Sequence, residues 1–493
     1  MSPEVEHPLK VLFVTAEVAP LVKTGGLADV SYALPKALKE AGHDVRVGLP
    51  LYGTLPDESR GEHRCIVSAD LGHGRVTGGL RESKLPGTEV PLYLIEHKAY
   101  FDRMHPYHHQ NIEYADNLSR FSFFSLALLD GIRQLDWRPD VVHCNDWHSA
   151  GIPIHLKMHR FASDPFWAGV ASVFTIHNLA YQGRFRSWQL PESGLGLDLF
   201  HPGCLEYYGD LNLMKGAIAF ASQINTVSPR YAKEIQTPAY GEGLDGFLRT
   251  RSRDISGILN GVDYTEWHPA TDVHIPANYS VDDLSGKAVC KRALQEECGL
   301  PVSDAPLFGM VSRFDRQKGL DFQIDALERM LLQDIQVIVQ GAGAPDLEQQ
   351  YEAIAERFPS KMRSIFRYDA GLAHRIEAGA DFFLMPSRFE PSGLSQLYSL
   401  AYGTVPIVRK TGGLADSIRD LTRTNLNRNR ATGIVFEPIS GDALANAMDR
   451  AIRLYHEPAL LHQVRLNAMR EDFSWEHSAN EYLRLYRKAI ARP

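Results

Sequence analysis

Two identical heptapeptides, each beginning with a lysine and containing paired glycines, are the first candidates for chemistry. They are Lys23–Asp29 and Lys410–Asp416, and both read KTGGLAD. Each follows an apolar run typical of a buried strand and precedes apolar residues at helical spacing. Glycines at a strand-to-helix turn let a ligand approach the backbone, whose N–H groups can then face an anion. A single copy could equally be a tight turn, but two copies favour an anionic ligand held by two similar halves.

A second group of candidates also stands at predicted strand ends. Arg313 and Lys318 share the loop after the predicted strand 307–311, and an arginine fork with a lysine suits a diphosphate. Such a pair would stabilise a departing anion, although exposed basic loops are common without any function. Glu390 follows the predicted strand 382–385. Its carboxylate could bind sugar hydroxyls or face an oxocarbenium centre, or it could simply be an acid at a helix terminus.

Histidine and aspartate complete the set of polar strand ends. Asp146 comes after the predicted strand 141–143, and His177 after the predicted strand 170–176. His177 could donate to a sugar hydroxyl or a phosphate, whereas a lone histidine more often satisfies a local backbone group. A further histidine cluster matches no standard zinc spacing, so we expect a mobile loop there and no metal site. Its members are His105, His108 and His109.

Several common nucleotide and nucleophile motifs are absent from the sequence. There is no G-x-x-x-x-G-K-[ST] segment, so an ordinary P-loop NTPase is not expected. Residues 341–344 (GAGA) lack the third glycine of a dinucleotide-binding loop. No D-x-D occurs, which disfavours transferases that hold a diphosphate through a metal, and no G-x-S-x-G nucleophile elbow is present.

Composition narrows the class of protein further. A chain of 493 residues fits two domains. A net charge of −8 argues against nucleic acid as the main partner. No apolar run is long enough for a membrane span, and residues 1–10 show no secretory leader. The five scattered cysteines form no C-x-x-C pair, so we expect reduced thiols and a cytoplasmic location.

The elements that must position these residues alternate between strand and helix patterns in the first half. Residues 52–90 are interpreted as irregular hairpins, and 101–117 as a surface loop that can close over a ligand. An amphipathic helix is predicted over about 117–134, with an apolar inner face. That face comprises Leu118, Phe121, Leu128 and Ile132. Strands are predicted at 10–15, 44–49, 90–95, 141–143, 170–176 and 224–227, with a helix over 27–38.

A second strand–helix series begins after the irregular stretch 264–280, where we place the connection between domains. Strands are predicted at 307–311, 335–339, 365–368, 382–385, 405–408 and 434–436, and the last helices at about 442–455 and 475–490. Helix-length connections imply parallel sheets, whose ligands lie at the carboxyl ends of the strands. The expected fold is α/β, with two doubly wound Rossmann-like domains facing a cleft, residues 1–262 and 263–474.

Seven motifs, in order from about residue 9 to 490, resemble bacterial glycogen synthases and plant starch synthases. They are residues 23–30 (KTGGLADV), 143–148 (HCNDWH), 174–183 (FTIHNLAYQG), 259–263 (LNGVD), 312–319 (SRFDRQKG), 386–394 (PSRFEPSGL) and 411–416 (TGGLAD). The resemblance implies a GT-B glycosyltransferase that moves glucose from ADP-glucose to the non-reducing end of an α-1,4-glucan, with retention and without a cofactor. It also implies that residues 475–493 cross back onto the first, acceptor-side domain, and that the second domain binds the sugar nucleotide.

The resemblance also implies roles for individual residues. His177, Arg313, Lys318 and Glu390 would form the catalytic set, with the two cations on the diphosphate and Glu390 beside the transferred sugar. Asp146 and His177 would contact glucose. The other implied substrate-binding residues are Lys23, Gly25, Gly26, Asp29, Asn178, Asn260, Tyr368 (stacked on the base), Ser392, Gly393, Leu394, Thr411, Gly412 and Gly413. Retention without an evident nucleophile suggests front-face substitution within an ion pair. Ser392 replaces the cysteine usual in the family, and we expect activity to survive this change.

Other functions remain open from the sequence. A transferase of the same fold could make a small glucoside or disaccharide, or use UDP-glucose, because acceptor choice lies in loops such as 101–117. A sugar-nucleotide-binding protein without catalysis is a further alternative, although such a protein would be expected to have lost some of the catalytic set. A phosphorylase with pyridoxal phosphate lacks a matching lysine context.

Overall fold

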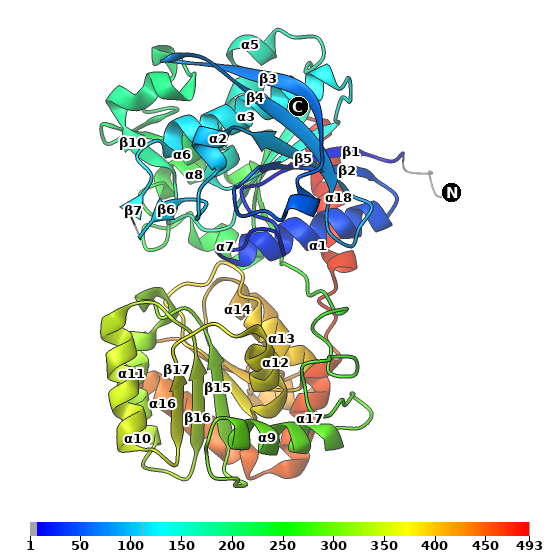
Figure 1. The fold of residues 1–493 in the computed structure, drawn as a ribbon. Helices are drawn as coiled ribbons and strands as arrows, with labels where there is room; N and C mark the ends of the chain where they lie inside the picture. Colours follow the sequence, from blue (N-terminus) through cyan, green and yellow to red (C-terminus); the bar gives the residue numbers. More distant parts are fainter. Residues whose placement is uncertain (1–6, 111, 493) are drawn as a thin grey trace. The chain divides into compact units, whose positions relative to one another are not determined.

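The computed structural model describes residues 7–110 and 112–492, and the chain forms two compact units (Figure 1). Unit 1 comprises the chain up to Val227, then Ala232–Gly261, and the segment from Trp475 onward. Unit 2 comprises Ser228–Tyr231 and Val262–Ser474. The first six residues, part of the segment in which no leader is expected, lie outside the described residues, as does Asn111 in 101–117.

Among the described residues, unit 1 is built on a nine-stranded sheet of order β14-β13-β9-β8-β1-β2-β5-β4-β3. From β14 to β5 all neighbours pair in parallel, and the order of strands reverses at β1. This is a doubly wound arrangement, as expected from the sequence. The strands are β1 (Lys10–Val14), β2 (Asp44–Pro50), β3 (Glu62–Leu71), β4 (Gly74–Lys84), β5 (Pro91–Glu96), β8 (Val141–Asn145), β9 (Ala171–Ile176), β13 (Gln223–Thr226) and β14 (Ile255–Gly257).

Residues 52–90 contain a hairpin, as predicted from the sequence, but it is long and regular and not a set of irregular hairpins. β3 and β4 make a long antiparallel hairpin, with a bulge between His63 and Cys65, and β4 continues the sheet through β5. Val67, Ala69 and Leu71 alternate with more exposed residues along β3 and are buried. One face of this hairpin is exposed, and the charged residues on it obscure the strand pattern in the sequence.

The helix α3 (Asn117–Gln134) has the predicted bounds, but it is not amphipathic. Every residue from Asn117 to Ile132 is buried, because the helix packs against β3 and β4 and also against the helix α4 (Gly151–Lys157). The other unit 1 elements are α1 (Gly26–Glu40), η1 (Asp57–Ser59), α2 (Lys98–Phe101), β6 (His108–His109), β7 (Ile112–Glu113), η2 (Trp147–Ser149), α5 (His159–Ala162), β10 (Arg184–Arg186), η3 (Ser187–Ser193), η4 (Leu197–Leu199), β11 (Glu206–Tyr207), β12 (Asp210–Asn212), α6 (Leu213–Phe220), α8 (Asp245–Thr250) and η5 (Ser252–Asp254). The helix α7 (Pro229–Glu234) is divided between the units, since Ser228–Tyr231 is assigned to unit 2.

The last helix, α18 (Trp475–Ile490), belongs to unit 1, which confirms that the chain crosses back to its first domain. It packs against α1, β8, β9 and β13, and Figure 1 shows it in red against the blue amino-terminal elements. The Tyr486 hydroxyl lies 2.8 Å from Nδ1 of His143, and Asn225 Nδ2 donates to the Tyr482 hydroxyl at 3.2 Å. These buried polar contacts join the end of the chain to its central strands.

Unit 2 has a six-stranded sheet among the described residues, in the order β17-β16-β15-β18-β19-β20. All neighbours are parallel, and the order again reverses at the first strand of the unit. The strands are β15 (Leu307–Val311), β16 (Gln336–Gln340), β17 (Met362–Ile365), β18 (Phe382–Met385), β19 (Val405–Arg409) and β20 (Ile434–Phe436). The prediction of a strand at 365–368 is therefore wrong, because β17 ends at Ile365.

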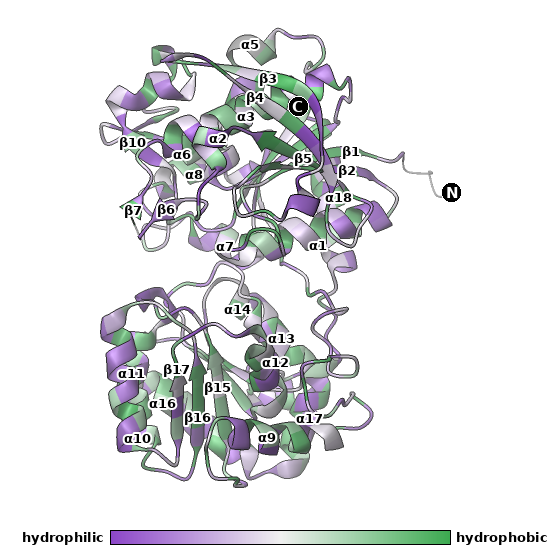
Figure 2. Ribbon diagram, in the orientation of Figure 1, coloured by the Kyte–Doolittle hydropathy of each residue, from purple (hydrophilic) through white to green (hydrophobic). Residues whose placement is uncertain are grey.

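Helices cover the unit 2 sheet. Figure 2 shows mainly hydrophobic colour in strands such as β16 and hydrophilic colour along much of α10 and α11. The elements are α9 (Ser285–Glu297), η6 (Arg316–Lys318), α10 (Leu320–Met330), α11 (Pro345–Arg357), α12 (Ala370–Gly379), α13 (Ser395–Ala401), α14 (Gly412–Ser417), α15 (Arg423–Asn427), α16 (Gly441–Tyr455) and α17 (Pro458–Met469).

Residues 264–280 are not the linker predicted from their irregular pattern, because they pack onto unit 2. The Trp267 ring stacks on His374 at 3.8 Å and on Tyr398 at 3.9 Å between centroids. Tyr279 is buried, and its hydroxyl donates to the Tyr402 carbonyl at 2.9 Å. Burial here depends on scattered aromatic residues, which leave no helix or strand period in the sequence.

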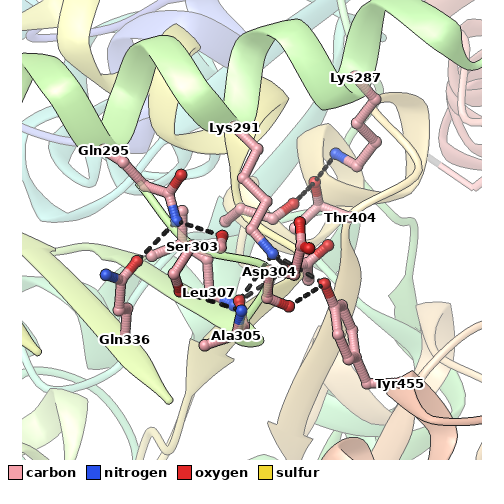
Figure 3. Close-up of polar contacts among 12 residues, drawn as sticks. Lys287, Lys291, Gln295, Ser303, Asp304, Ala305, Leu307, Gln336, Thr404 and Tyr455 are labelled. Carbon is pink, nitrogen blue, oxygen red and sulfur yellow. Dashed lines mark hydrogen bonds and ion pairs between the residues drawn. The ribbon is translucent and has the colours of Figure 1, made fainter. Parts of the chain in front are cut away.

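Side chains on one face of α9 form hydrogen bonds and an ion pair with residues at the amino ends of the unit 2 strands (Figure 3). Four-residue spacing brings three side chains onto this face: Lys287, Lys291 and Gln295. Lys287 Nζ donates to Thr404 Oγ1 at 2.6 Å, just before β19. Lys291 Nζ binds Asp381 Oδ2 at 2.7 Å, just before β18, and Gln295 Nε2 donates to Gln336 Oε1 at 2.7 Å, at the start of β16. The carboxyl ends of these strands lie at the opposite edge of the sheet.

Candidate functional site

The predicted catalytic residues lie beyond the carboxyl ends of central strands in both units. In unit 1, Asp146 follows β8 and His177 follows β9. In unit 2, Arg313 and Lys318 follow β15, and Glu390 follows β18. Ligands of doubly wound sheets bind at such ends, next to the strand where the order reverses.

The first KTGG loop is exposed and has glycines that its own surroundings do not require. Gly25 is extended, with φ of −159°, and a Cβ placed there would meet nothing within 4 Å. Within the described part of the chain, the N–H groups of Gly26 and Leu27, at the start of α1, have no acceptor. Open space and unused donors at a helix start favour a bound anion, as the sequence predicts.

Charged side chains flank this first loop. Lys23 Nζ lies 2.7 Å from Asp29 Oδ1, and 46% of the Lys23 side chain is exposed. Burial raises the pKa of the Asp29 carboxyl, and the Lys23 charge offsets part of that rise. The lysine therefore sits at the mouth of the loop with a carboxylate that orients it.

Glu17, which was not predicted from the sequence, holds the first loop from beneath. Its buried carboxylate accepts hydrogen bonds from Thr24 N at 2.6 Å, Gly25 N at 3.2 Å and Thr24 Oγ1 at 2.5 Å. The Tyr107 hydroxyl donates to the same carboxylate at 2.7 Å. An acid three residues after a buried strand is a weak signal, and no motif marks it.

The second KTGG copy has a different structural role in the described chain. Gly412 has φ of +42°, and a Cβ there would lie 1.9 Å from the Glu390 carbonyl oxygen. A Cβ on Gly413 would lie 2.1 Å from the carbonyl oxygen of Ser392. Thr411, Gly412 and Gly413 are all buried. These glycines are required because the backbone of the Glu390 loop approaches them closely.

Asp146 is a buried carboxylate on a strained backbone. Its φ of +53° is rare for a residue with a side chain, and such strain gathers at functional sites. His177 N donates to Asp146 Oδ1 at 2.8 Å, and Asp146 N donates to the Thr175 carbonyl at 3.0 Å. Burial raises the pKa of Asp146 to about 7, although the N–H groups of His177 and Asn178 lower it in part.

His177 is held in one tautomer by its neighbour. Its Nε2 lies 2.9 Å from Asn145 Oδ1, and Asn145 Nδ2 donates to the Val14 carbonyl at 3.0 Å. The amide oxygen of Asn145 is therefore the acceptor, so His177 Nε2 carries the proton and Nδ1 keeps its lone pair. Burial lowers the pKa of His177 to about 3, so the ring is neutral near pH 7 and its Nδ1 can accept a hydrogen bond from a hydroxyl.

Lys318 and Glu390, from separate loops, form a buried ion pair in unit 2. Lys318 Nζ lies 2.6 Å from Glu390 Oε2, and Ser387 Oγ donates to the same oxygen at 2.9 Å. The side chains are only 20% and 7% exposed. Arg313, on the same loop as Lys318, is exposed, and its side chain has no hydrogen-bond or ion-pair partner among the described residues. One cation is thus fixed while the other is available to a ligand.

The turn after Glu390 presents unused backbone donors. Across the described chain, no acceptor is found for the N–H groups of Ser392, Gly393 and Leu394. Gly393 has φ of +69°. The Ser392 hydroxyl donates locally, to the Gly393 carbonyl at 3.3 Å.

The remaining candidates are more dispersed. Tyr368 lies beyond β17 and is 65% exposed. Asn178 Oδ1 accepts the Ala180 N–H at 3.0 Å and closes a turn. Asn260 is buried near the end of a unit 1 segment, and its Oδ1 has no partner among the residues described. No cluster of three or more metal-ligating side chains is found in the described part of the chain.

Both halves of the chain match known protein families. Residues 10–250 match the family described as the starch synthase catalytic domain, and residues 295–468 match glycosyl transferases group 1. The glycogen synthase of Thioalkalivibrio sulfidiphilus is 47% identical over 98% of this chain and 100% of its own length. That of Aeromonas salmonicida is 44% identical over 99% of each chain.

Solved structures give the same result. The catalytic domain of starch synthase IV from Arabidopsis thaliana, bound to ADP and acarbose, is 34% identical, with a TM-score of 0.89 over 99% of this chain and 100% of that one. Sucrose-phosphate synthase from Thermosynechococcus elongatus shares the fold, with a TM-score of 0.59 at 17% identity, over 98% of this chain and 99% of that one. None of the helices in the described residues is long and apolar enough to cross a membrane.

Proposed function

Because the chain belongs to the glycogen and starch synthase family of retaining GT-B glycosyltransferases, we propose that it transfers glucose from ADP-glucose to the non-reducing end of an α-1,4-glucan. The preference for ADP is supported by the Arabidopsis relative, which binds ADP and acarbose. The same relative supports an oligosaccharide acceptor, since acarbose is an oligosaccharide analogue. A cytoplasmic location is supported by the cysteines, which are all free thiols in the described chain.

The observation that carries this proposal is the Lys318–Glu390 ion pair beside the exposed Arg313. When the bond between glucose and the diphosphate breaks, negative charge grows on the diphosphate. Lys318 is fixed by its 2.6 Å contact with Glu390, and Arg313 is available to close on the same anion. Two cations at the leaving group stabilise the charge without a general acid or a metal ion, so we propose that the reaction needs no metal cofactor.

Glu390 would act on the sugar side of the breaking bond. Its Oε2 is occupied by Lys318 and Ser387, whereas Oε1 has no protein partner among the residues described. A carboxylate oxygen in that state can bind a sugar hydroxyl or stabilise the positive charge that develops on the sugar ring. The unused N–H groups of the turn 392–394 would bind oxygens of the donor. Retention then follows from substitution on one face of the sugar within an ion pair.

In unit 1, Asp146 and His177 would bind glucose hydroxyls. The neutral His177 ring offers Nδ1 as an acceptor, and burial raises the pKa of Asp146 to about 7, so this carboxyl can donate or accept near neutral pH. The exposed KTGG loop, with Lys23 at its mouth, would bind the anionic part of the donor. We also propose the substrate-binding roles implied by the family for Asn178, Asn260, Tyr368 and the second glycine pair.

A first experiment compares three single substitutions in the β15–α10 loop. We expect Lys318→Ala and Arg313→Ala each to lower kcat by about 100-fold or more, because each removes charge stabilisation of the leaving diphosphate. Arg316→Ala is the matched control: Arg316 is on the same loop but is exposed and pairs with Asp346 at 2.8 Å. Its kcat should stay within about twofold of the unmodified enzyme. Normal turnover in both test variants would remove the cation pair from the mechanism.

A further inference from the structure

The Glu17 carboxylate joins two loops of unit 1 that are far apart in the sequence. One oxygen accepts from Thr24 N at 2.6 Å and Gly25 N at 3.2 Å. The other accepts from Thr24 Oγ1 at 2.5 Å and from the Tyr107 hydroxyl at 2.7 Å. An ionised carboxylate has about four acceptor positions, so this set saturates it. If the KTGG loop moves and Glu17 moves with it, the hydrogen bond between Glu17 and Tyr107 must either break or draw Tyr107 along.

Tyr107 in turn fixes the segment 101–117 against the strand end that carries Asp146. The Tyr107 ring stacks on His148, with centroids 4.6 Å apart and an angle of 27° between the rings. The Tyr107 carbonyl accepts from Asn117 Nδ2 at 3.0 Å and from Tyr114 N at 3.1 Å. Burial, reinforced by the Glu17 charge, raises the pKa of Tyr107 well above its ordinary value, so its hydroxyl remains a donor.

The division of donors in the KTGG loop shows how a ligand could act on this link. Glu17 occupies the N–H groups of Thr24 and Gly25, whereas those of Gly26 and Leu27 have no acceptor in the described chain. An anion bound at Gly26 and Leu27 would fix this turn. The two residues just before it, Thr24 and Gly25, donate to Glu17, so the anion would also fix the position of that carboxylate.

We propose that Glu17 is a positioning residue that couples occupancy of the KTGG loop to the order of residues 101–110 through the Tyr107 hydroxyl. The inference rests on the proposed function, because the ligand of the KTGG loop is taken to be a nucleoside diphosphate sugar. Binding of the donor would then order the segment proposed to select the acceptor before the glucan arrives. The buried Glu17 carboxylate would thus favour binding of the donor before binding of the glucan.

Hydrogen exchange with ADP-glucose, without acceptor, tests this coupling in the full chain. In the unmodified protein we expect slower exchange both at 23–28 and at 101–110. In Tyr107→Phe, protection at 23–28 should remain and protection at 101–110 should fall about tenfold, the size expected for a hydrogen bond to a charged group. Tyr114→Phe is the control, since it removes a hydroxyl of the same segment that does not contact Glu17, and it should behave like the unmodified protein.

The outcomes separate the inference from the proposed function. Equal protection of residues 101–110 in the unmodified protein and in Tyr107→Phe would overturn the coupling. Protection of residues 23–28 without any protection of 101–110 in the unmodified protein would also overturn it. No protection at 23–28 or at 313–319 would overturn the proposed donor binding, and the inference with it.

Kinetics give a second readout that a purely structural role would not reproduce. Tyr107→Phe should raise KM for the glucan severalfold and leave KM for ADP-glucose and kcat nearly unchanged. Glu17→Gln should raise both KM values, because the amide NH₂ cannot accept the Thr24 and Gly25 N–H groups that the second carboxylate oxygen accepts. An equal loss of kcat in both variants with unchanged KM values would contradict the proposal.

Discussion

Asp146 and Glu390 are both buried carboxylates, but the chain holds them in different ways. Glu390 faces the Lys318 ammonium at 2.6 Å, so its charge is matched within the protein. Asp146 accepts the His177 backbone N–H, and its buried position raises its pKa to about 7. The difference suits the two proposed tasks, since a leaving anion needs a fixed cation nearby and sugar hydroxyls need a partner that can both donate and accept.

The raised pKa of Asp146 predicts a pH-dependent cost to folding. The folded pKa of about 7 exceeds the ordinary value of 3.8, so the contribution to stability is present below pH 3.8 and is lost as pH rises through 7. Asp146→Asn has no carboxyl group to ionise, so this loss of stability with rising pH does not occur in the variant. Its free energy of unfolding, relative to the unmodified protein, should rise between pH 5 and pH 8 by about 2 to 3 kcal/mol.

Urea unfolding of unit 1 at several pH values measures this effect. Asp136→Asn is the matched control, because Asp136 also has a positive φ, of 52°, but is exposed. The control should show no such trend with pH. A difference between Asp146→Asn and the unmodified protein that is constant from pH 5 to pH 8 would contradict the account of Asp146.

Some residues of the site could be predicted from the sequence, and others could not. Lys318 and Glu390 stand in strand-to-helix loops with a recognisable pattern, and the structure brings them together. Glu17 and Tyr107 have no motif, because their partnership depends on the tertiary fold. The two KTGG copies are identical in sequence, yet the chain excludes a side chain at Gly412 and Gly413 and leaves open space at Gly25. Local sequence could not distinguish a ligand-facing glycine from one required by packing.

At the scale of elements, the face of α9 shows how unit 2 is held at the edge remote from the candidate residues. Asp381 receives Lys291 Nζ at 2.7 Å, Arg465 at 2.7 Å and the Leu307 N–H at 3.0 Å. Burial acts to raise the pKa of Asp381, but the Arg465 and Lys291 charges outweigh it and hold that pKa below its ordinary value. One carboxylate thus ties two helices to the start of two strands.

Removing that carboxylate should destabilise unit 2 strongly. Asp381→Ala leaves two largely buried cations without their partner, which should lower the free energy of unfolding by about 3 to 5 kcal/mol. Asp449→Ala is the control, since Asp449 contacts the half-exposed Arg329 at 3.3 Å on the surface. It should cost about 1 kcal/mol or less. Urea unfolding of unit 2 measures both, and equal small losses would show that the buried cluster adds no stability.

Elements were predictable where burial is periodic. The strands 307–311, 382–385 and 434–436 and the helix 475–490 have the predicted bounds, because each has a continuous apolar run or an apolar face. The hairpin β3–β4 was predicted only as irregular hairpins, and the packing of the stretch 264–280 was missed. In the first, charged residues occupy the exposed face, and in the second, isolated aromatic rings provide the burial.

At the scale of the whole molecule, the two units repeat one topology. In each, the strand order reverses at the first strand, and the candidate residues follow that strand or one of the next two strands beside it. The alternation of strands and helices was sufficient to predict two such sheets. It could not predict the antiparallel β3–β4 extension, because edge hairpins obey no crossover rule. Similarity to glycogen and starch synthases extends over both units.

The most direct test of the proposed function follows the anomeric carbon of the donor. The enzyme is incubated in EDTA with ADP-glucose, isotopically labelled at that carbon, and a maltooligosaccharide, and the products are followed by NMR. The account predicts a new α-1,4-linked signal at the non-reducing end, one ADP released for each glucose added, and much slower transfer from UDP-glucose. Labelled glucose released to water, a β-linkage, or equal transfer from UDP-glucose would contradict it.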